Sequence, residues 1–210
     1  MKKIIFFDCD GVLTIDGSSW LVLHRYFGSI DNSYFAELYD KGLITYLDWM
    51  KIDVALMINS WGQRITKRDV IEALKSIRVR NESVEVVKLL KQRGYIIGVI
   101  SSGIGLLVKR ICKEIGADIC LYNELLFYNN ELIPGGKAWV PLKEKPEIIK
   151  YVYRSLGISK ENTIYVGDSK WDIPVFNVVG KSIIMEPCSN LCSYADHSIS
   201  SLYELLEILN

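Results

Sequence analysis

Short apolar runs alternate along the chain with longer stretches of helical periodicity. Polar and turn-forming residues bound the runs, a pattern typical of strands buried on both faces of a parallel sheet. The predicted strands are Lys3–Phe7, Tyr95–Ile100, Ile119–Leu121, Thr163–Val166 and Ser182–Met185.

The stretches between these runs carry apolar residues three and four positions apart, which is the spacing of one helix face. Three of them stop at a glycine, a residue that commonly ends helices. The predicted helices are Glu82–Gln92, Leu106–Ile115, Pro146–Leu156 and Leu202–Leu209. Strands that alternate with helices predict an α/β fold around a mostly parallel sheet.

Two stretches break this alternation. Asn123–Pro134 has apolar runs on both sides of Asn129–Asn130 and predicts a β-hairpin, because asparagine tolerates the left-handed turn region. Ile15–Val79 contains no convincing buried strand, and its aromatic and apolar residues fall at helical spacing. We therefore expect an α/β core formed by residues 1–14 and 80–210, with a helical subdomain of residues 15–79 inserted after the first strand.

Composition narrows the class of protein. The 210 residues are 50% hydrophobic and carry a formal net charge of zero, which argues against a dedicated binder of nucleic acid or of anionic membranes. The apolar run at the N-terminus is too short for a signal peptide. Five cysteines without a framework spacing indicate a reducing compartment. These features together predict a cytoplasmic protein.

The stretch IIFFDCDGVLT, Ile4 to Thr14, places two carboxylates directly after a buried strand. Asp8 and Asp10 are held close together and partly away from water, so their charges repel each other. A divalent cation is the simplest group that would offset this cost. Cys9 between them would point to the opposite face of the strand and pack there.

Other strand ends carry polar side chains as well. Ser101 and Ser102 follow the strand at Tyr95–Ile100, Asp168 and Asp172 follow the strand at Thr163–Val166, and Lys145 opens the preceding helix. In open α/β sheets, ligands bind outside the carboxyl ends of the strands. Oxygen ligands for Mg²⁺, hydroxyl groups and a lysine at one edge suit the binding of a phosphate beside a hard cation.

The four segments DCDGVLT, ISSG, LKEKPEII and VGDSKWD resemble, in order, the four motifs of the haloacid dehalogenase (HAD) superfamily. The resemblance implies a HAD-like Rossmannoid sheet with a small inserted helical cap. It also implies a phosphatase in which Asp8 is the nucleophile that forms an aspartyl-phosphate and Asp10 is the general acid and base. The implied Mg²⁺ ligands are Asp8, the main-chain carbonyl of Asp10, Asp168 and Asp172; the implied phosphate-binding residues are Ser101, Ser102 and Lys145.

The position of the insert and the spacing of the motifs look like the phosphoserine phosphatase branch of this superfamily. That branch has a glutamate where this chain has Gly17 with Asp16 beside it, and a cap arginine where the best register places Asp53, near Lys51. Trp171 replaces an asparagine in the last motif. The resemblance therefore implies a small phosphorylated metabolite as the substrate, and these departures do not specify phosphoserine. The candidate specificity residues are Asp16, Ser18, Ser19, Lys51, Asp53 and Trp171.

Several alternatives stay open at this point. A phosphotransferase or mutase would pass the phosphoryl group from Asp8 to another hydroxyl, and a binding protein would keep the fold with weak turnover, for which Trp171 is the one supporting feature. A homodimer formed through apolar cap surface is a further option. His24 in SSWLVLHRYFG could face the site, but we favour a packing role at the edge of an amphipathic helix.

Overall fold

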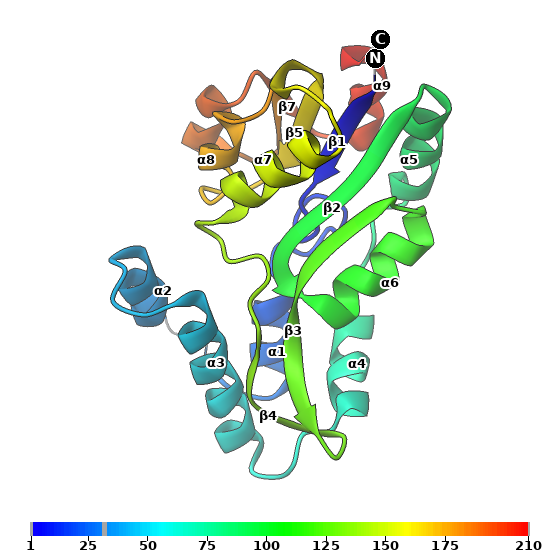
Figure 1. Ribbon diagram of the computed structural model, residues 1–210. Coiled ribbons are helices and arrows are strands. Elements are labelled where there is room, and N and C mark those ends of the chain that lie inside the picture. Colours follow the sequence, from blue (N-terminus) through cyan, green and yellow to red (C-terminus); the bar gives the residue numbers. More distant parts are fainter. Residues whose placement is uncertain (1, 31–32, 210) are drawn as a thin grey trace.

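The computed structural model describes residues 2–30 and 33–209, and its centre is a seven-stranded sheet (Figure 1). The strand order is β4-β3-β2-β1-β5-β6-β7, and every neighbouring pair is parallel except β3 and β4. The strands are β1 (Lys3–Phe7), β2 (Tyr95–Ile104), β3 (Ile119–Tyr128), β4 (Glu131–Lys137), β5 (Thr163–Gly167), β6 (Lys181–Met185) and β7 (His197–Ile199). The predicted α/β fold with a mostly parallel sheet is confirmed.

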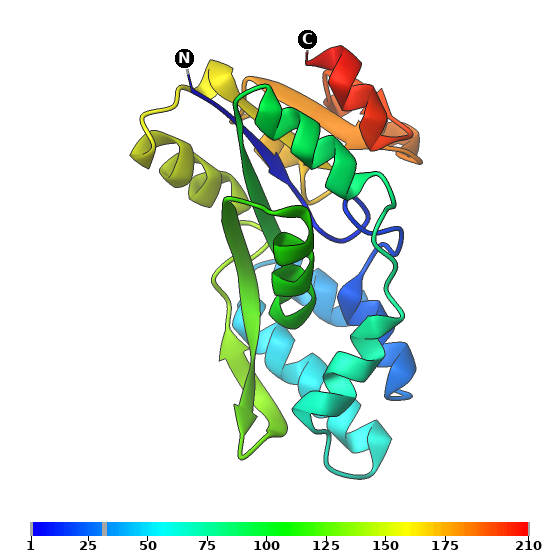
Figure 2. The same cartoon turned by 90° about the vertical axis from the view of Figure 1, so that its right-hand side faces the viewer.

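Helices cover both faces of this sheet (Figures 1 and 2). Side chains alternate along β1, so Ile5 and Phe7 pack against α5, α6 and α9, whereas Ile4 and Phe6 pack against α7 and α8. The helices are α5 (Ser83–Gln92), α6 (Gly105–Ile115), α7 (Lys145–Ser155), α8 (Ile173–Phe176) and α9 (Leu205–Ile208). Short 3₁₀ turns lie at Lys160–Asn162, Ser189–Tyr194 and Leu202–Glu204. The helix predicted over Leu202–Leu209 is thus a 3₁₀ turn followed by one helical turn.

Residues 15–79 contain helices, as their spacing predicts. These are α1 (Ser19–Tyr26), α2 (Ser33–Asp40), α3 (Tyr46–Trp61) and α4 (Lys67–Lys75), and their group lies beyond the carboxyl end of β1 (Figure 1). Ser18, Thr45 and Thr66 cap α1, α3 and α4 by accepting hydrogen bonds from main-chain N–H groups of the first turn. The two chain connections to the sheet run side by side, since Thr14 and Val79 form an isolated antiparallel bridge.

The predicted hairpin is confirmed and is longer than expected. β3 and β4 continue past the sheet and lie alongside the helices of residues 15–79 (Figures 1 and 2). Asn129 and Asn130 form the turn with φ values of 46° and 67°. The hairpin end is fastened to the segment before α4, because Leu132 N donates to Ile65 O at 2.7 Å and Lys67 N donates to Asn130 O at 3.0 Å.

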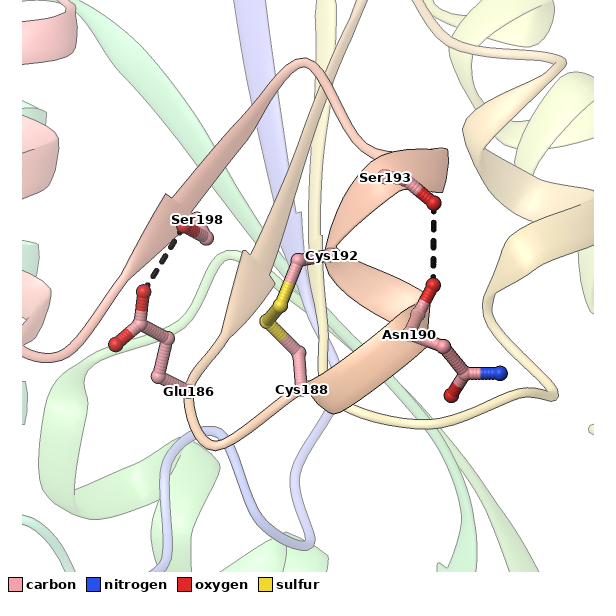
Figure 3. The surroundings of a disulfide bond; sticks show 6 residues. All are labelled: Glu186, Cys188, Asn190, Cys192, Ser193 and Ser198. Atoms are coloured by element: carbon pink, nitrogen blue, oxygen red, sulfur yellow. Dashed lines mark hydrogen bonds between the residues drawn. A yellow bond between two sulfur atoms is a disulfide. The ribbon is translucent and has the colours of Figure 1, made fainter.

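Four of the five cysteines are paired. Cys112 bonds to Cys120, joining α6 to β3, and Cys188 bonds to Cys192 within the segment between β6 and β7 (Figure 3). Cys9 is free and buried, as expected for a side chain that packs under the sheet edge. The expectation that the cysteines form no disulfide framework is therefore wrong. Partners four and eight residues apart fall within bonding range once the chain turns, with Cα atoms 5.2 Å and 6.3 Å apart.

This pairing removes the cysteine argument for a reducing compartment, and with it one of the supports for a cytoplasmic location. Within residues 2–30 and 33–209, no helix has both the length and the apolar character that crossing a membrane requires.

Candidate active site

The carboxyl ends of β1, β2 and β5 meet at one edge of the sheet because these strands are neighbours and parallel. Asp8, Asp10, Ser101, Ser102 and Asp168 therefore line a single pocket of about 400 Å³. Side chains from α1, α2 and α3 close its other side, so residues far apart in the sequence share one cavity.

A buried lysine links two of the carboxylates below this pocket. Lys145 is the first residue of α7 and has no exposed surface. Its Nζ lies 2.8 Å from Asp8 Oδ2 and 3.0 Å from Asp172 Oδ1. Burial alone would lower the pKa of Lys145, but the charges of Asp172 and Asp8 raise it above its usual value. Lys145 therefore stays positively charged inside the protein.

Tyr165 completes this network and was not anticipated from the sequence. It lies fully buried in the middle of β5, donates its hydroxyl proton to Asp172 and accepts a hydrogen bond from Lys145 Nζ at 3.2 Å. Burial would raise the pKa of Asp172, yet the Lys145 charge and the Tyr165 hydroxyl outweigh it and lower that pKa. A tyrosine within an otherwise apolar strand could have indicated this role from the sequence, since a buried hydroxyl group needs a hydrogen-bond partner.

Asp10 is held from the inserted helices. Its Oδ2 accepts hydrogen bonds from the main-chain N of Ser19 at 2.8 Å and from Ser19 Oγ at 2.6 Å, at the start of α1. Its Oδ1 is buried and has no hydrogen-bond partner within the described chain. Burial raises the pKa of Asp10, and the bonds from Ser19 reduce that effect. A fixed carboxyl group with a raised pKa and one uncommitted oxygen suits a general acid.

The carboxylates at the strand ends form a group with the dimensions of a metal site. Asp8, Asp168 and Asp172 each offer an oxygen atom, and these atoms lie within 4.8 Å of one another. Burial and the neighbouring carboxylates raise the pKa of Asp168 to about 8, and burial raises the pKa of Asp8 to about 6 despite Lys145. Gly11 permits the close approach, since a Cβ atom there would lie 2.1 Å from Asp168 Oδ2. This crowded oxygen set fits Mg²⁺.

The crowding predicts that Asp168→Asn will stabilise the protein in Mg²⁺-free buffer. The folded-state pKa is raised, so ionisation of Asp168 costs stability progressively from about pH 4 and fully above pH 8. We expect the free energy of unfolding at pH 9 to rise by about 1–2 kcal/mol, with no gain at pH 4. Denaturant titrations at both pH values measure this. Added Mg²⁺ should stabilise the unmodified protein more than the variant, and equal stabilisation would contradict the metal site.

The end of β2 is irregular and is held by several elements. The register with β3 shifts between Ile100 and Ile104, which places the serine segment against the pocket. Ser101 Oγ accepts from Gly103 N at 3.0 Å, and Ser102 Oγ is buried with no hydrogen-bond partner in the described residues. Both serines thus line the pocket on a fixed strand end, and their hydroxyl groups could donate to phosphoryl oxygens.

The candidate specificity residues divide into two groups. Ser18, Asp53 and Trp171 line the pocket, and Ser19 orients Asp10. Lys51 and Asp16 do not line it. The Lys51 ammonium pairs with Asp48 at 3.3 Å on the outer face of α3, and Asp16 Oδ2 accepts from Arg78 N at 3.0 Å beside the paired chain connections.

His24 is buried, and it packs as expected from the helix pattern, but it also has a charged neighbour. Its Nε2 lies 3.5 Å from Asp53 Oδ1, and its Nδ1 lies 2.7 Å from Ser29 Oγ. This contact joins α1 to α3. It could not be predicted from the sequence, because the spacing of residues within α1 does not show which residues of another helix lie beside them.

One face of α3 supplies Asp53, a candidate from the sequence, and also three pocket residues that the sequence pattern marked only as aromatic or apolar positions at helical spacing. Tyr46, Trp49, Met50 and Asp53 recur at helical spacing and all line the pocket. The Tyr46 hydroxyl donates to Ser102 O at 2.6 Å, so this helix contacts the strand end directly. The spacing located the buried face correctly, but it could not distinguish burial against other helices from burial against a cavity.

Comparison with known proteins agrees with this architecture. A family model described as haloacid dehalogenase-like hydrolase matches residues 2–180. A phosphoserine phosphatase of Methanocaldococcus jannaschii is 27% identical over 184 residues, which are 87% of this chain and 84% of that protein. A phosphoserine phosphatase of Archaeoglobus fulgidus is 33% identical over 134 residues, 63% of this chain and 39% of that protein.

Solved structures agree as well. A substrate-bound phosphoserine phosphatase complex superimposes with a TM-score of 0.82 at 25% identity, covering 99% of this chain and 98% of the other. The chain therefore belongs to the haloacid dehalogenase-like hydrolase family. Within that family it is a phosphatase of the phosphoserine phosphatase-like branch, as the four motifs imply.

Proposed function

We propose that the protein is a Mg²⁺-dependent phosphomonoester hydrolase that acts on a small phosphorylated metabolite through an aspartyl-phosphate at Asp8. The observation that carries the proposal is that Asp8 and Asp10 line one pocket, where Asp10 Oδ1 has no hydrogen-bond partner among residues 2–30 and 33–209. A cavity of about 400 Å³ suits a small ester rather than a polymer.

In the first step, a carboxylate oxygen of Asp8 attacks phosphorus, the ester P–O bond breaks, and Asp10 gives its proton to the departing alkoxide. In the second step, Asp10 takes a proton from water, the water oxygen attacks phosphorus, and the P–O bond to Asp8 breaks. Inorganic phosphate leaves and both carboxyl groups return to their initial states. Ser19 keeps Asp10 oriented through both steps.

The remaining residues hold the reacting groups. Asp8, Asp168, Asp172 and the main-chain carbonyl of Asp10 would hold Mg²⁺, which when bound neutralises the crowded carboxylates and the phosphate. Hydroxyl groups of Ser101 and Ser102 and the ammonium of Lys145 would bind the phosphoryl oxygens, Lys145 from its place beside Asp8.

Residues 15–79 are proposed to act as a cap over this site, with boundaries after residue 14 and after residue 79. The support comes from the pocket, because Trp20 of α1 and Trp49 of α3 line it opposite the strand ends. A cap that excludes bulk water strengthens the electrostatic interactions at the reacting phosphorus.

Release of inorganic phosphate from p-nitrophenyl phosphate, measured with Mg²⁺ and with EDTA, tests the proposed function. We expect turnover with Mg²⁺ and its loss in EDTA. Absence of turnover with Mg²⁺, in protein that binds the ion, would overturn the hydrolase proposal. Transfer of the phosphoryl group to an added alcohol in preference to water would identify a phosphotransferase instead.

A further inference from the structure

Aromatic side chains from the inserted helices and from the core line the pocket together. They are Trp20 in α1, Tyr46 and Trp49 in α3, and Trp171 in the loop after β5. We call these four side chains the aromatic wall. All four belong to one apolar cluster, so the wall is continuous from the inserted helices to the loop of the core.

The polar atoms of two of these rings are already bonded to the main chain. The Tyr46 hydroxyl donates to Ser102 O at 2.6 Å, and Trp20 Nε1 donates to the same oxygen at 3.4 Å. A hydroxyl or indole N–H that is engaged in this way is not free to bind a polar group of a ligand. These two rings therefore offer the pocket mainly the apolar surface of their carbon atoms.

Contacts between rings hold the wall in place. The ring centroids of Trp49 and Tyr46 are 5.9 Å apart, and those of Trp49 and Tyr39 are 5.7 Å apart. Tyr39 also contacts Trp171, with ring centroids 5.9 Å apart. Each pair is tilted or edge-to-face, which are favourable arrangements of aromatic rings. A surface that is already ordered loses little conformational freedom when a ligand binds to it.

The pocket offers no cationic side chain to the organic part of a substrate. Among the described residues that line it, none is lysine or arginine. The lysines next to lining residues in the sequence are engaged elsewhere. Lys143 Nζ donates to Asp40 O at 2.6 Å, and Lys170 Nζ lies 4.6 Å from the ring centroid of Trp171. Lys145 lies buried between two carboxylates at the phosphate site.

Asp53 also lines the pocket, but it takes part in a contact between the inserted helices. Its Oδ1 lies 3.5 Å from His24 Nε2, and this pair joins α3 to α1. The imidazole itself does not line the pocket. We therefore assign no ligand group to Asp53, and the aromatic wall remains as the surface that meets the organic part of the ester.

We propose that the pocket selects phosphate monoesters of uncharged aromatic alcohols, whose ring packs against the aromatic wall, over esters whose organic part carries a carboxylate. The inference rests on the proposed function, because it names the substrate class of the same site. A carboxylate would leave water without gaining a cationic partner, which opposes its binding. A flat uncharged ring instead buries apolar surface and packs against aromatic neighbours in the favoured geometries.

Two pairs of ligands separate the effects of charge and of aromatic character. Isobutyl phosphate and phosphoglycolate have the same number of non-hydrogen atoms, and the isopropyl group of the first is a carboxylate in the second. Benzyl phosphate and cyclohexylmethyl phosphate match in the same way, and only the first has a flat aromatic ring. We would measure binding calorimetrically to the Asp8→Asn protein with Mg²⁺, since this variant should not consume the esters.

Both preferences have an expected size. Isobutyl phosphate should bind about tenfold more tightly than phosphoglycolate, because the carboxylate has no cation to pair with. Benzyl phosphate should bind about fivefold more tightly than cyclohexylmethyl phosphate, because aromatic pairs contribute more than the burial of their area.

Substitution of Trp49 tests the assignment to the wall. Trp49→Leu should bring benzyl and cyclohexylmethyl phosphate within about twofold of each other and change the binding of inorganic phosphate by less than about twofold. Trp139→Leu removes a tryptophan that is 60% exposed and does not line the pocket. It is the matched control and should leave the preference unchanged. If Trp49→Leu fails to fold, Trp171→Leu should still reduce the preference, because its ring belongs to the same wall.

Three outcomes would overturn the inference. They are phosphoglycolate binding as tightly as isobutyl phosphate, benzyl phosphate binding no more tightly than cyclohexylmethyl phosphate, and an aromatic preference that the substitutions of Trp49 and Trp171 leave unchanged. None of them depends on turnover. Absence of p-nitrophenyl phosphate hydrolysis with both preferences intact would overturn the proposed hydrolase and leave the role of the aromatic wall standing. Hydrolysis with reversed preferences would do the opposite.

Discussion

Asp8→Asn is expected to lower kcat/KM for phosphate release by a factor of about 10⁴ or more. The carboxamide keeps the size of the side chain but is a very poor nucleophile, so the aspartyl-phosphate cannot form. Lys145 can still donate to the remaining carbonyl oxygen, and the fold should therefore survive the substitution. Initial rates with p-nitrophenyl phosphate and Mg²⁺, together with a thermal melt, measure both properties.

The matched control is Asp69→Asn, which removes a carboxylate that caps α4 and does not line the pocket. It should lose a little stability and keep its rate. Retention of more than about one hundredth of the activity in Asp8→Asn would contradict the nucleophile assignment, because loss of a nucleophile costs far more than this.

Lys145→Met is expected to cause the largest loss of stability of any single substitution considered. The methionine fills a similar volume, but Asp8 and Asp172 would then be buried carboxylates without their cation. Removing one partner of a buried ion pair costs about 3–5 kcal/mol. For a chain of this length the loss corresponds to a fall of roughly 6–20 °C in Tm. Urea titration in Mg²⁺-free buffer measures the change.

Two further variants separate charge from packing. Lys150→Met removes a lysine of the same helix that pairs with Glu147 near the surface, and it should change stability by less than about 1 kcal/mol. The double variant Lys145→Met with Asp172→Asn should recover part of the loss, because one unpaired charge disappears. Equal stability of the single and double variants would show that the cost arises from packing rather than from charge.

The group of residues at the carboxyl edge of the sheet was predictable, because their closeness in space depends only on which parallel strands are neighbours. Asp8, Ser101 and Asp168 each follow a short apolar run, and parallel neighbours bring such positions together. The position of Lys145 also followed from a helix boundary, since it opens α7. The role of Tyr165 was not predicted, because its hydrogen-bond partner Asp172 lies outside the strand. The apolar pattern of a strand shows only which residues are buried.

The sequence predicted that residues 15–79 form helices, but it could not predict which of their side chains face the pocket. Lys51 and Asp53 are two residues apart, yet the helix turns Asp53 into the pocket and Lys51 toward solvent. Motif spacing along the sequence cannot show which of the two residues faces the pocket, because this depends on the orientation of α3 relative to the pocket. The disulfides were not predicted for a related reason. Cys112 and Cys120 come together only because the chain reverses direction between α6 and β3.

The central place of β1 in the sheet has a consequence for folding. β1 is made first, but its two neighbours are β2, which begins at Tyr95, and β5, which begins at Thr163. Closing such long loops is entropically costly and slows folding, and unpaired apolar strands invite association between nascent chains. The apolar strand that precedes Asp8 must therefore wait, during synthesis, for much of the chain to emerge. Asp8, the proposed nucleophile, therefore reaches its final surroundings only after most of the chain has been synthesised.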